Sequence, residues 1–325
     1  MNDHSLLKIS GLVCAAALML SSVPLSASAG GAREEAPFYT SGDNIDTNDI
    51  PGNRHGVRHY IDVENMLQMP DLPTGCESVS LTIVLDHVGY PADKFDIVRN
   101  YLPKQEFYYI DDQLYGADFV TTFAGDPEDE NSYGCYAPCM VTTANNYLSA
   151  NKYKGKAYDL SGSDFEKLLS DYIEHDIPLM IWITNYGLEP SSLSTVWKTP
   201  EGKTVQWRRP EHCVVLIGYD REKNVVYTAD PIYGLTAYDH DTLVQRFCEM
   251  GMQAVLVNSK PDLGTELPGD ADMDGFITSN DALKILRSSV ELEEFDSYRL
   301  DISDTDNDGV ITSGDALIVL RESIM

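Results

Sequence analysis

The sequence is poor in basic residues and in long apolar runs, and each shortage excludes a class of partner. Lysine and arginine number 23 against 52 aspartates and glutamates, which gives a formal net charge of −29. A surface this acidic repels phosphate backbones, so we expect no nucleic-acid partner. The apolar runs are too short to span a bilayer, so we expect no membrane insertion. With 43% hydrophobic residues the chain can still bury a real core.

Cysteine is also scarce, because six in 325 residues are too few for a disulfide scaffold. The N-terminus has a short polar start, an apolar stretch from Ile9 to Leu20 and small residues at 26–29. This pattern predicts a secretory signal peptide at 1–29, cleaved after Ala29, and hence a secreted, extracellular protein. Cleavage removes Cys14 and leaves five cysteines, an odd number that requires a free thiol or an intermolecular bridge.

Composition divides the rest of the chain into four segments. Residues 30–60 are polar and are predicted to form an extended lead-in, and 61–257 a folded domain. Prolines and glycines mark 258–268 as a linker, and 269–325 form a separate repeat module.

Within the folded domain, the apolar spacing of 77–87 predicts a helix. The pattern Ser163 to Glu166 predicts a capping box that opens a helix to about Glu174, and a strand follows at 178–184. Two β-rich runs, 213–218 and 224–229, flank a polar turn and predict an antiparallel hairpin. A helix followed by strands indicates an α+β domain.

The repeat module contains one short pattern twice. Residues 270–281 read DADMDGFITSND and 304–315 read DTDNDGVITSGD; 13 of the 21 positions in 270–290 are identical in 304–324. Aspartates at loop positions 1, 3, 5 and 12 and glycine at 6 suit a calcium loop, so we expect two structural Ca²⁺ ions. The predicted ligands are Asp270, Asp272, Asp274, Asp281 and the backbone carbonyl of Phe276 in the first loop, and Asp304, Asp306, Asp308, Asp315 and the carbonyl of Val310 in the second.

The repeats differ from an ordinary EF-hand in two ways. Position 12 is aspartate rather than glutamate, and Pro268-Gly269 stand where an entering helix would be. A duplicated loop with only an exiting helix resembles a type I dockerin, over about 268–325. The resemblance implies a small all-α module that binds a cohesin on a scaffolding protein, within a cellulosome-like complex. Ser279-Asn280 and Ser313-Gly314 would belong to its recognition face; a free-standing calcium buffer or sensor pair is the alternative.

Cys76 is the best chemical feature of the folded domain, in the segment PTGCESVS at 73–80. A cysteine in the first turn of a helix meets the positive end of the helix dipole, which favours the thiolate. Gly75 would keep the approach to the sulfur open. The alternative is a small buried core residue. His87 lies about 16 Å further along the same helix and is out of reach, and we expect the remaining histidines of the polar segments, His55, His59, His175 and His240, to be solvated.

His212 differs from these because it begins an apolar strand. In the predicted hairpin, His212 and Asp230 are diagonal neighbours on one face, within side-chain reach. A carboxylate in that position could orient the imidazole and stabilise its protonated form. The alternative is a strand-edge histidine beside a solvated aspartate.

Four segments together resemble the papain-like, C39-type cysteine peptidase domain, over about 66–257. The resemblance implies Cys76 as the nucleophile, His212 as the base and later the acid, and Asp230 as the group that orients His212. It also implies an oxyanion donor upstream, for which Gln68 is the candidate, although an ordinary polar loop residue is the alternative. The segments are LPTGCESVS at 72–80, YGCYAP at 133–138, EHCVVLIGYD at 211–220 and ADPIYG at 229–234.

The remaining cysteines and tryptophans fit structural roles. Cys135 and Cys139 have no companion pair at metal-like spacing, so structural thiols or a disulfide are favoured over a zinc site. Cys213 should point away from His212, into the core. Trp197 and Trp207 bracket a turn-rich stretch that is either a mobile flap or a packed hairpin.

The sequence thus predicts a secreted cysteine peptidase that acts on peptides and is anchored through a dockerin. A non-catalytic binding or structural component of the same assembly remains an alternative, as does a papain-like acyltransferase, because a fold alone does not choose the reaction. Removal of calcium should unfold the repeat module and leave the reactivity of the thiol intact.

Overall fold

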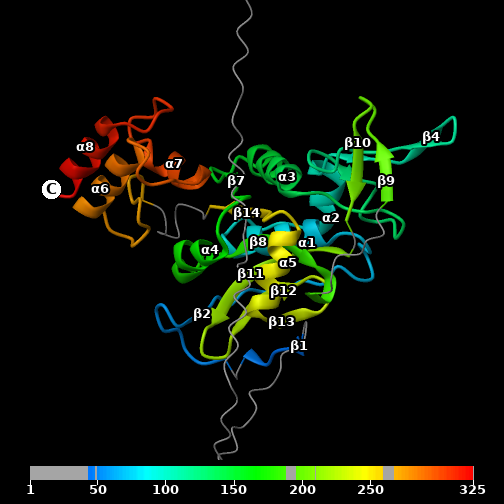
Figure 1. The fold of residues 1–325 in the computed structure, drawn as a ribbon, viewed down its shortest axis with the longest axis horizontal. Helices are drawn as coiled ribbons and strands as arrows, with labels where there is room; N and C mark the ends of the chain where they lie inside the picture. Colours follow the sequence, from blue (N-terminus) through cyan, green and yellow to red (C-terminus); the bar gives the residue numbers. More distant parts are fainter. Residues whose placement is uncertain (1–42, 48–49, 188–194, 209, 259–266, 325) are drawn as a thin grey trace, which may run out of the picture. The chain divides into compact units, whose positions relative to one another are not determined.

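The computed structural model describes residues 43–47, 50–187, 195–208, 210–258 and 267–324 (Figure 1). The predicted signal peptide, part of the lead-in and most of the linker lie outside the described residues. No helix in the described ranges is long and apolar enough to cross a membrane.

An eight-stranded sheet organises the described part of 43–258. Its strands follow the order β1-β13-β12-β11-β8-β14-β7, and β2 pairs with β11 beside that path. All of these pairings are antiparallel. The strands are β1 Asp43–Asn44, β2 Arg58–Tyr60, β7 Ala157–Asp159, β8 Leu179–Thr184, β11 Glu211–Asp220, β12 Val225–Asp230, β13 Gly234–Asp239 and β14 Ala254–Val257.

Strand β11 is the centre of this sheet, because it pairs with β8, β12 and β2. Every residue of β11 after Glu211 is buried, which explains its nearly continuous apolar sequence. Val215 lies opposite Ala229, and a bulge follows between Leu216 and Gly218. The hairpin predicted from the sequence is therefore confirmed.

Helices pack on the sheet and position the candidate nucleophile. Helix α1 (Cys76–His87) contacts β11, β8 and α3 (Ala137–Ala150). Ten of its twelve residues are buried, so α1 is a core helix rather than an amphipathic surface helix. Helix α5 (His240–Glu249) packs against β8, β12 and β13 and lies in front of the sheet in Figure 1. The remaining turns of helix are α2 Lys94–Asp96, the π-helical turn Ile97–Tyr101, α4 Phe165–Asp171 and the 3-10 turns Ile173–His175 and Asn185–Gly187.

The start of α4 corrects the predicted capping box. Its N-cap is Asp164, whose side chain accepts hydrogen bonds from the backbone N–H groups of Glu166 and Lys167. The predicted cap at Ser163 was wrong by one residue, because the carboxylate of Asp164 supplies a competing and stronger acceptor. The helix also ends at Asp171, before the predicted Glu174.

A smaller four-stranded sheet, in the order β10-β9-β5-β4, stands beside the main one. Trp197 on β9 and Trp207 on β10 are both buried, in a second core that also contains Phe119. The two strands are therefore a packed hairpin. The strands are β4 Tyr108–Ile110, β5 Gln113–Tyr115, β9 Thr195–Lys198 and β10 Thr204–Trp207, and a separate parallel pair joins β3 Lys104–Gln105 to β6 Phe123–Ala124.

Residues 267–324 contain three helices: α6 (Ser279–Ser288), α7 (Ser297–Ser303) and α8 (Ser313–Glu322). The sequence analysis did not predict α7. Its N-cap Asp296 accepts from two backbone N–H groups, and the helix leads directly into the second loop. The expectation that each loop has only an exiting helix is therefore wrong for the second loop.

Helix α7 also contacts the sheet domain. The hydroxyl of Tyr158 donates to Asp301 Oδ2 at 2.6 Å, and Lys156 Nζ donates to Asp301 Oδ1 at 2.9 Å. Ser297 Oγ donates to the backbone oxygen of Asp159 at 2.9 Å. Side-chain contacts thus join the repeats to β7, in addition to the chain itself.

Candidate active site and cation-binding loops

Helix α1 begins at Cys76, and Gly75 is its N-cap. A Cβ atom at Gly75 would lie 2.7 Å from the Cβ of Leu72, so the close turn before the cysteine requires glycine. Gly75 therefore serves the turn rather than the open approach to the sulfur that the sequence suggested. Cys76 itself is 7% exposed.

His212 and Asp230 meet as the hairpin predicted: His212 Nε2 lies 3.0 Å from Asp230 Oδ1. The same carboxylate accepts from the backbone N–H groups of Ile232 and Tyr233, and Tyr238 donates its hydroxyl to Oδ2 at 3.1 Å. Burial opposes ionisation of Asp230, but the charge of His212 and these hydrogen bonds lower its pKa overall. The anionic form of Asp230 is thus favoured beside Nε2 of His212, the ring nitrogen that faces it.

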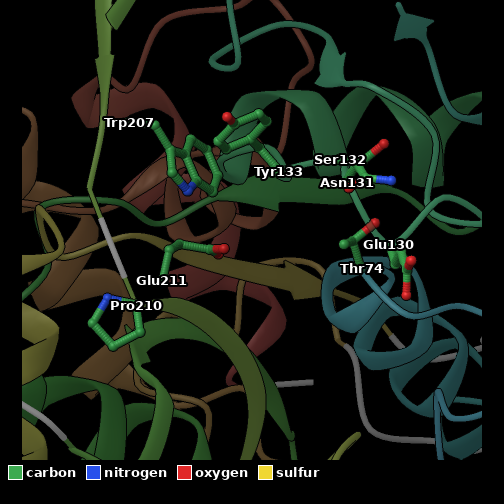
Figure 2. A pocket seen from close by; sticks show the side chains of 8 residues that line it. All are labelled: Thr74, Glu130, Asn131, Ser132, Tyr133, Trp207, Pro210 and Glu211. Carbon is green, nitrogen blue, oxygen red and sulfur yellow. The ribbon is translucent and has the colours of Figure 1, made fainter. Parts of the chain in front are cut away.

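A cavity of about 580 Å³ adjoins these residues (Figure 2). It reaches the site through Thr74, two residues before Cys76, and through Glu211, the neighbour of His212. The loop 130–133 and Trp207 form its other walls. The lining residues are Thr74, Glu130, Asn131, Ser132, Tyr133, Trp207, Pro210 and Glu211.

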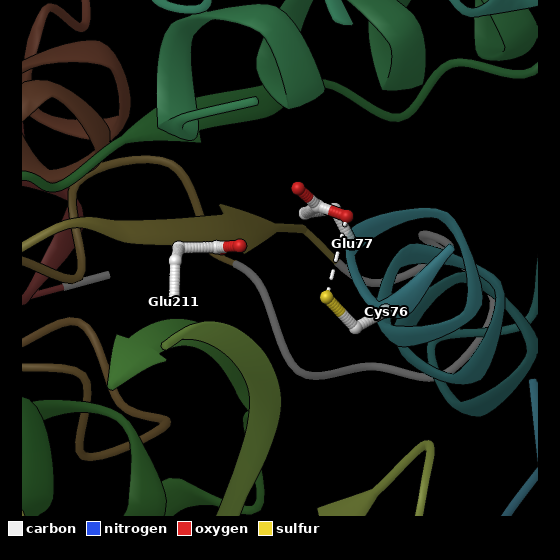
Figure 3. Close-up of side chains that lie close together, drawn as sticks. All are labelled: Cys76, Glu77 and Glu211. Carbon is white, nitrogen blue, oxygen red and sulfur yellow. Dashed lines mark hydrogen bonds between the residues drawn. The ribbon is translucent and has the colours of Figure 1, made fainter. Parts of the chain in front are cut away.

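Two glutamates lie directly beside the thiol (Figure 3). Cys76 Sγ donates to Glu77 Oε2 at 3.3 Å, and Glu77 Oε1 accepts from the backbone N–H of Cys135 at 2.7 Å. The carboxyl group of Glu211 points toward this pair, and the three ligand atoms of Cys76, Glu77 and Glu211 lie within 4.8 Å of one another. A Cβ at Gly134 would fall 2.2 Å from Glu77 Oε1, so glycine there makes room for the carboxyl group.

This environment disfavours the thiolate form of Cys76. Burial raises the pKa of Cys76, and the carboxyl groups of Glu77 and Glu211 raise it further. Burial also raises the pKa of Glu77 to about 7, although the N–H of Cys135 and the charge of His212 act in the opposite direction. The pKa of Glu211 is raised by burial and by Glu77. The thiolate that the helix dipole was expected to favour is therefore opposed by a stronger local effect, burial beside two carboxyl groups.

Gln68, the predicted oxyanion donor, is buried close to both parts of the site. Its backbone N–H donates to the oxygen of Pro231, next to Asp230. Its side-chain Nε2 donates to the oxygen of Pro73 at 3.0 Å, three residues before Cys76. Because an amide nitrogen carries two hydrogens, the second remains for a developing oxyanion. The catalytic roles of Gln68, Cys76, His212 and Asp230 stay predictions.

The structure also tests the predictions for the remaining cysteines and for His59. Cys135 and Cys139 form no disulfide in the described ranges and are buried, so of the two structural roles left open for them the thiols are the one found, and Cys213 is buried in the core as expected. His59 is buried and lies 2.7 Å from Asp176 Oδ1, which contradicts the expectation that it is solvated. The strand pairing of β2 with β11 carries His59 inward.

The two aspartate loops adopt the same geometry. In the first, Asp270 accepts from the backbone N–H groups of Asp274 and Gly275, and Asp281 accepts from those of Asp272 and Thr278. In the second, the equivalent bonds join Asp304 to Asp308 and Gly309, and Asp315 to Asp306 and Thr312. Gly275 and Gly309 have φ of 82° and 87°, which permits the sharp turn at position 6.

Carboxylate oxygens converge in both loops. The ligand atoms of Asp270, Asp272 and Asp274 lie within 4.8 Å of one another, and so do those of Asp304, Asp306 and Asp315. Burial raises the pKa of Asp270 to about 6, and the neighbouring carboxylates add to the effect. Crowded carboxylates with a positive-φ glycine are the donor set that a hard cation requires.

Helices α6 and α8 form an apolar groove of about 320 Å³. Its leucines are partly exposed: Leu283 54%, Leu286 43%, Leu317 46% and Leu320 42%. Each lining residue of one repeat has its equivalent in the other. The four equivalent pairs are Ser279 and Ser313, Ala282 and Ala316, Leu283 and Leu317, and Leu286 and Leu320.

The place of Glu77 and Glu211 beside the thiol was not predicted from the sequence. Each is adjacent to a predicted catalytic residue, in GCES and in EHCV. The signal that could have found them is an acidic side chain at the start of an otherwise apolar helix or strand, because such a side chain is buried with its element. Their convergence depends on how α1 packs on β11, which local sequence does not reveal.

Comparison with known proteins identifies the sheet domain. The model of the Peptidase_C39 like family matches residues 60–255, so the chain belongs to the Peptidase_C39 like family. This confirms the predicted C39-type resemblance in that region and the mixed α+β fold. The repeat module lies outside the matched residues.

Two further comparisons agree with this assignment. The uncharacterized protein YvpB of Bacillus subtilis (strain 168) is 30% identical over 197 residues, which are 59% of this chain and 72% of that protein. A crystal structure from Bacillus anthracis, provisionally described as a C39-like peptidase, matches with a TM-score of 0.53 and 28% identity, over 61% of this chain and 96% of its own. Xylellain, a cysteine protease from Xylella fastidiosa, has a TM-score of 0.32 and 11% identity, over 71% of this chain and 99% of its own, and is too distant to carry an argument.

Proposed function

We propose that this chain is a secreted cysteine peptidase that acts on peptide bonds and is attached to a scaffold through its calcium-binding repeats. The contact that carries the peptidase proposal is the 3.0 Å bond between His212 and Asp230, beside a helix that begins at Cys76 in a domain of the Peptidase_C39 like family. A buried carboxylate on one imidazole nitrogen is the arrangement that prepares a histidine to accept a proton from a thiol.

In the proposed reaction, His212 takes the proton of Cys76, and the sulfur attacks the carbonyl carbon of the scissile bond. The carbonyl oxygen becomes an oxyanion, which Gln68 Nε2 stabilises. The C–N bond then breaks as His212 returns the proton to the leaving amine, which leaves an acyl group on Cys76. Water, deprotonated by His212, hydrolyses this thioester and restores the thiol.

The resting state explains when activation would occur. In the free protein the Cys76 thiol donates to Glu77, and burial beside Glu77 and Glu211 raises its pKa. The ion pair of thiolate and imidazolium would therefore form only once a substrate changes this environment. An idle thiol in a binding protein is the competing function that this observation favours.

A library of quenched fluorescent peptides separates the two. We expect the mature protein to cleave members of the library, Cys76→Ser to be inactive, and His212→Ala to lose at least about a thousandfold in kcat/KM. Cys248→Ser is the matched control, since Cys248 lies on α5 and is not among the predicted catalytic residues, and it should retain activity. Equal hydrolysis by wild type and Cys76→Ser would overturn the peptidase proposal.

The proposal for the repeats rests on their two loops and on the apolar groove. Ca²⁺ would be held by the aspartates at loop positions 1, 3, 5 and 12 and by one backbone carbonyl in each loop. The groove between α6 and α8 would then receive an apolar face of a cohesin.

Calorimetric titration with a purified cohesin module tests this proposal. We expect binding in Ca²⁺, loss of binding in a chelator, and strong weakening in Leu283→Glu with Leu317→Glu. Binding that survives chelation and the double substitution would exclude a dockerin.

A further inference from the structure

The cavity beside Cys76 has an aromatic side and an acidic side. The rings of Tyr133 and Trp207 have centroids 6.0 Å apart at 74°. Trp207 is further held by Phe119, at 5.2 Å, and by the stacked ring of Tyr136, at 5.8 Å. This side therefore offers packed aromatic surface to an occupant (Figure 2).

The acidic side consists of Glu130 and Glu211. Glu211 points its carboxyl group into the space between Trp207 and Thr74 (Figure 2). Its Oε1 atom is inaccessible to solvent and has no hydrogen-bond partner among the described residues. No lysine, arginine or histidine is among the described residues that line the cavity.

Other carboxylates of the same loop are already paired. Asp126 forms an ion pair with Lys104 at 2.6 Å, and Glu128 forms one with Arg99 at 2.5 Å. Glu130 has no ion pair among those found in the described ranges, and it faces the cavity instead. Among the described residues, the two acidic groups that line the cavity thus have no basic partner.

A buried carboxylate without a donor is costly unless a partner supplies one. A lysine or arginine side chain meets both sides of this cavity, because its apolar stem and cation suit aromatic rings and its N–H groups suit carboxylates. An acidic side chain would be repelled, and a neutral apolar one would leave Glu211 unpaired.

We propose that this cavity is the specificity subsite of the enzyme, that Glu211 selects a basic side chain in it, and that the substrates are peptides with arginine or lysine beside the scissile bond. The inference rests on the proposed peptidase function. A bound cation would also favour the ionised forms of Glu211 and of the Cys76 thiol, which links recognition of the substrate to activation of Cys76.

Paired peptides that differ at one position provide the first test. We expect kcat/KM for arginine or lysine beside the scissile bond to exceed that for the neutral isostere citrulline or norleucine by about tenfold or more. In Glu211→Gln the ratio of the two kcat/KM values should fall to about one to three, and this ratio is the readout, because Glu211 also affects the pKa of Cys76 and its loss can change the rate for both peptides. A wild-type ratio near one, or a ratio unchanged in Glu211→Gln, would refute the subsite.

A second measurement does not need turnover. Alkylation of Cys76 by a chloroacetamide with a guanidinium tail is compared with alkylation by a neutral chloroacetamide of equal length, and Cys248 is the internal reference. A preference for the cationic reagent that Glu211→Gln removes supports the subsite even if no peptide is cleaved, in which case only the peptidase proposal fails. Peptide cleavage without any preference for the cationic reagent would refute the subsite and leave the peptidase proposal standing.

Glu130→Gln covers the case in which Glu211→Gln does not fold. Glu130 lies on an exposed loop, and its substitution should lower the cationic preference about two- to threefold. High salt should lower the same preference in the wild type. Insensitivity of the preference to both changes would exclude an electrostatic subsite.

Discussion

The two halves of this molecule use carboxylates in opposite ways. In the repeats, aspartates crowd together in loops whose backbone N–H groups hold them, around a small core of Ala271, Ala282, Ile285, Ala316 and Val319. In the sheet domain, Glu77 and Glu211 are buried beside a thiol within a large apolar core. We expect that so small a core does not bear unpaired charge without a bound cation. A large core can tolerate an unpaired charge, and can reserve it for a ligand.

The largest effect should come from the loops. In Asp270→Ala with Asp304→Ala, or after chelation of calcium, we expect residues 267–324 to lose their helices. Circular dichroism should report this loss. All three tryptophans, Trp182, Trp197 and Trp207, belong to the sheet domain, so tryptophan fluorescence should not change. Glu322→Ala, at an exposed position of α8, is the control. A fluorescence change in parallel with the loss of helix would show that the sheet domain also depends on the cation.

Removing one negative charge at the buried site, without changing the shape of the side chain, should have the next largest effect, and this effect is on activity. Asp230→Asn keeps the shape of the side chain but removes the anion that holds His212. We expect kcat/KM to fall by at least about a hundredfold while the unfolding midpoint changes little. Asp241→Asn, whose side chain is 84% exposed, should leave the rate unaltered. Full activity of Asp230→Asn would mean that the carboxylate has only a structural role.

Glu77 provides a prediction of pH dependence. Its pKa is raised in the folded protein to about 7, from 4.5, so the contribution of Glu77 to stability should be most favourable below about pH 4.5 and be lost as the pH rises through 7. Glu77→Gln removes this cost and keeps an acceptor for Cys135. Relative to wild type, the variant should therefore gain about 2–3 kcal/mol between pH 5 and pH 8.

Urea unfolding followed by tryptophan fluorescence measures that difference. Exposed Glu201→Gln should show none. A constant difference between Glu77→Gln and wild type at both pH values would show that Glu77 is not a buried acid of raised pKa.

The smallest effect belongs to the contact between the two halves. Asp301→Asn weakens the bonds to Lys156 and Tyr158, which lie partly in solvent and should contribute less than about 1 kcal/mol. We expect a small shift in the thermal unfolding of α6 to α8 and none in the tryptophan transition. A shift of several degrees in both transitions would show that the halves unfold as one unit.

Much of this fold was accessible from the sequence, because its strongest patterns are local. The hairpin of β11 and β12 follows from two apolar runs around a polar turn, and the register brought His212 next to Asp230. The aspartate loops follow from spacing alone. Helix α7 was missed because its signal is one N-cap, Asp296, ahead of a short segment.

The charged groups around the Cys76 thiol could not be predicted from the sequence, for a different reason. The helix dipole at Cys76 is a local feature, whereas the opposing effect comes from Glu211, 135 positions away in the chain. Only the packing of α1 on β11 brings the two together. Long-range burial thus overturned an inference that was sound for an isolated helix.

The position of His212, the predicted base, on β11 has a consequence for how the protein would open. Strand β11 is hydrogen-bonded on both sides within the largest sheet, so its amide protons should exchange only through global unfolding, whereas those of β9 and β10, in the smaller sheet, should exchange through local opening. The wall of the cavity on β10 can then open locally while His212, the predicted base, keeps its position in the sheet. Substitutions in that wall should therefore change what enters the cavity without displacing His212.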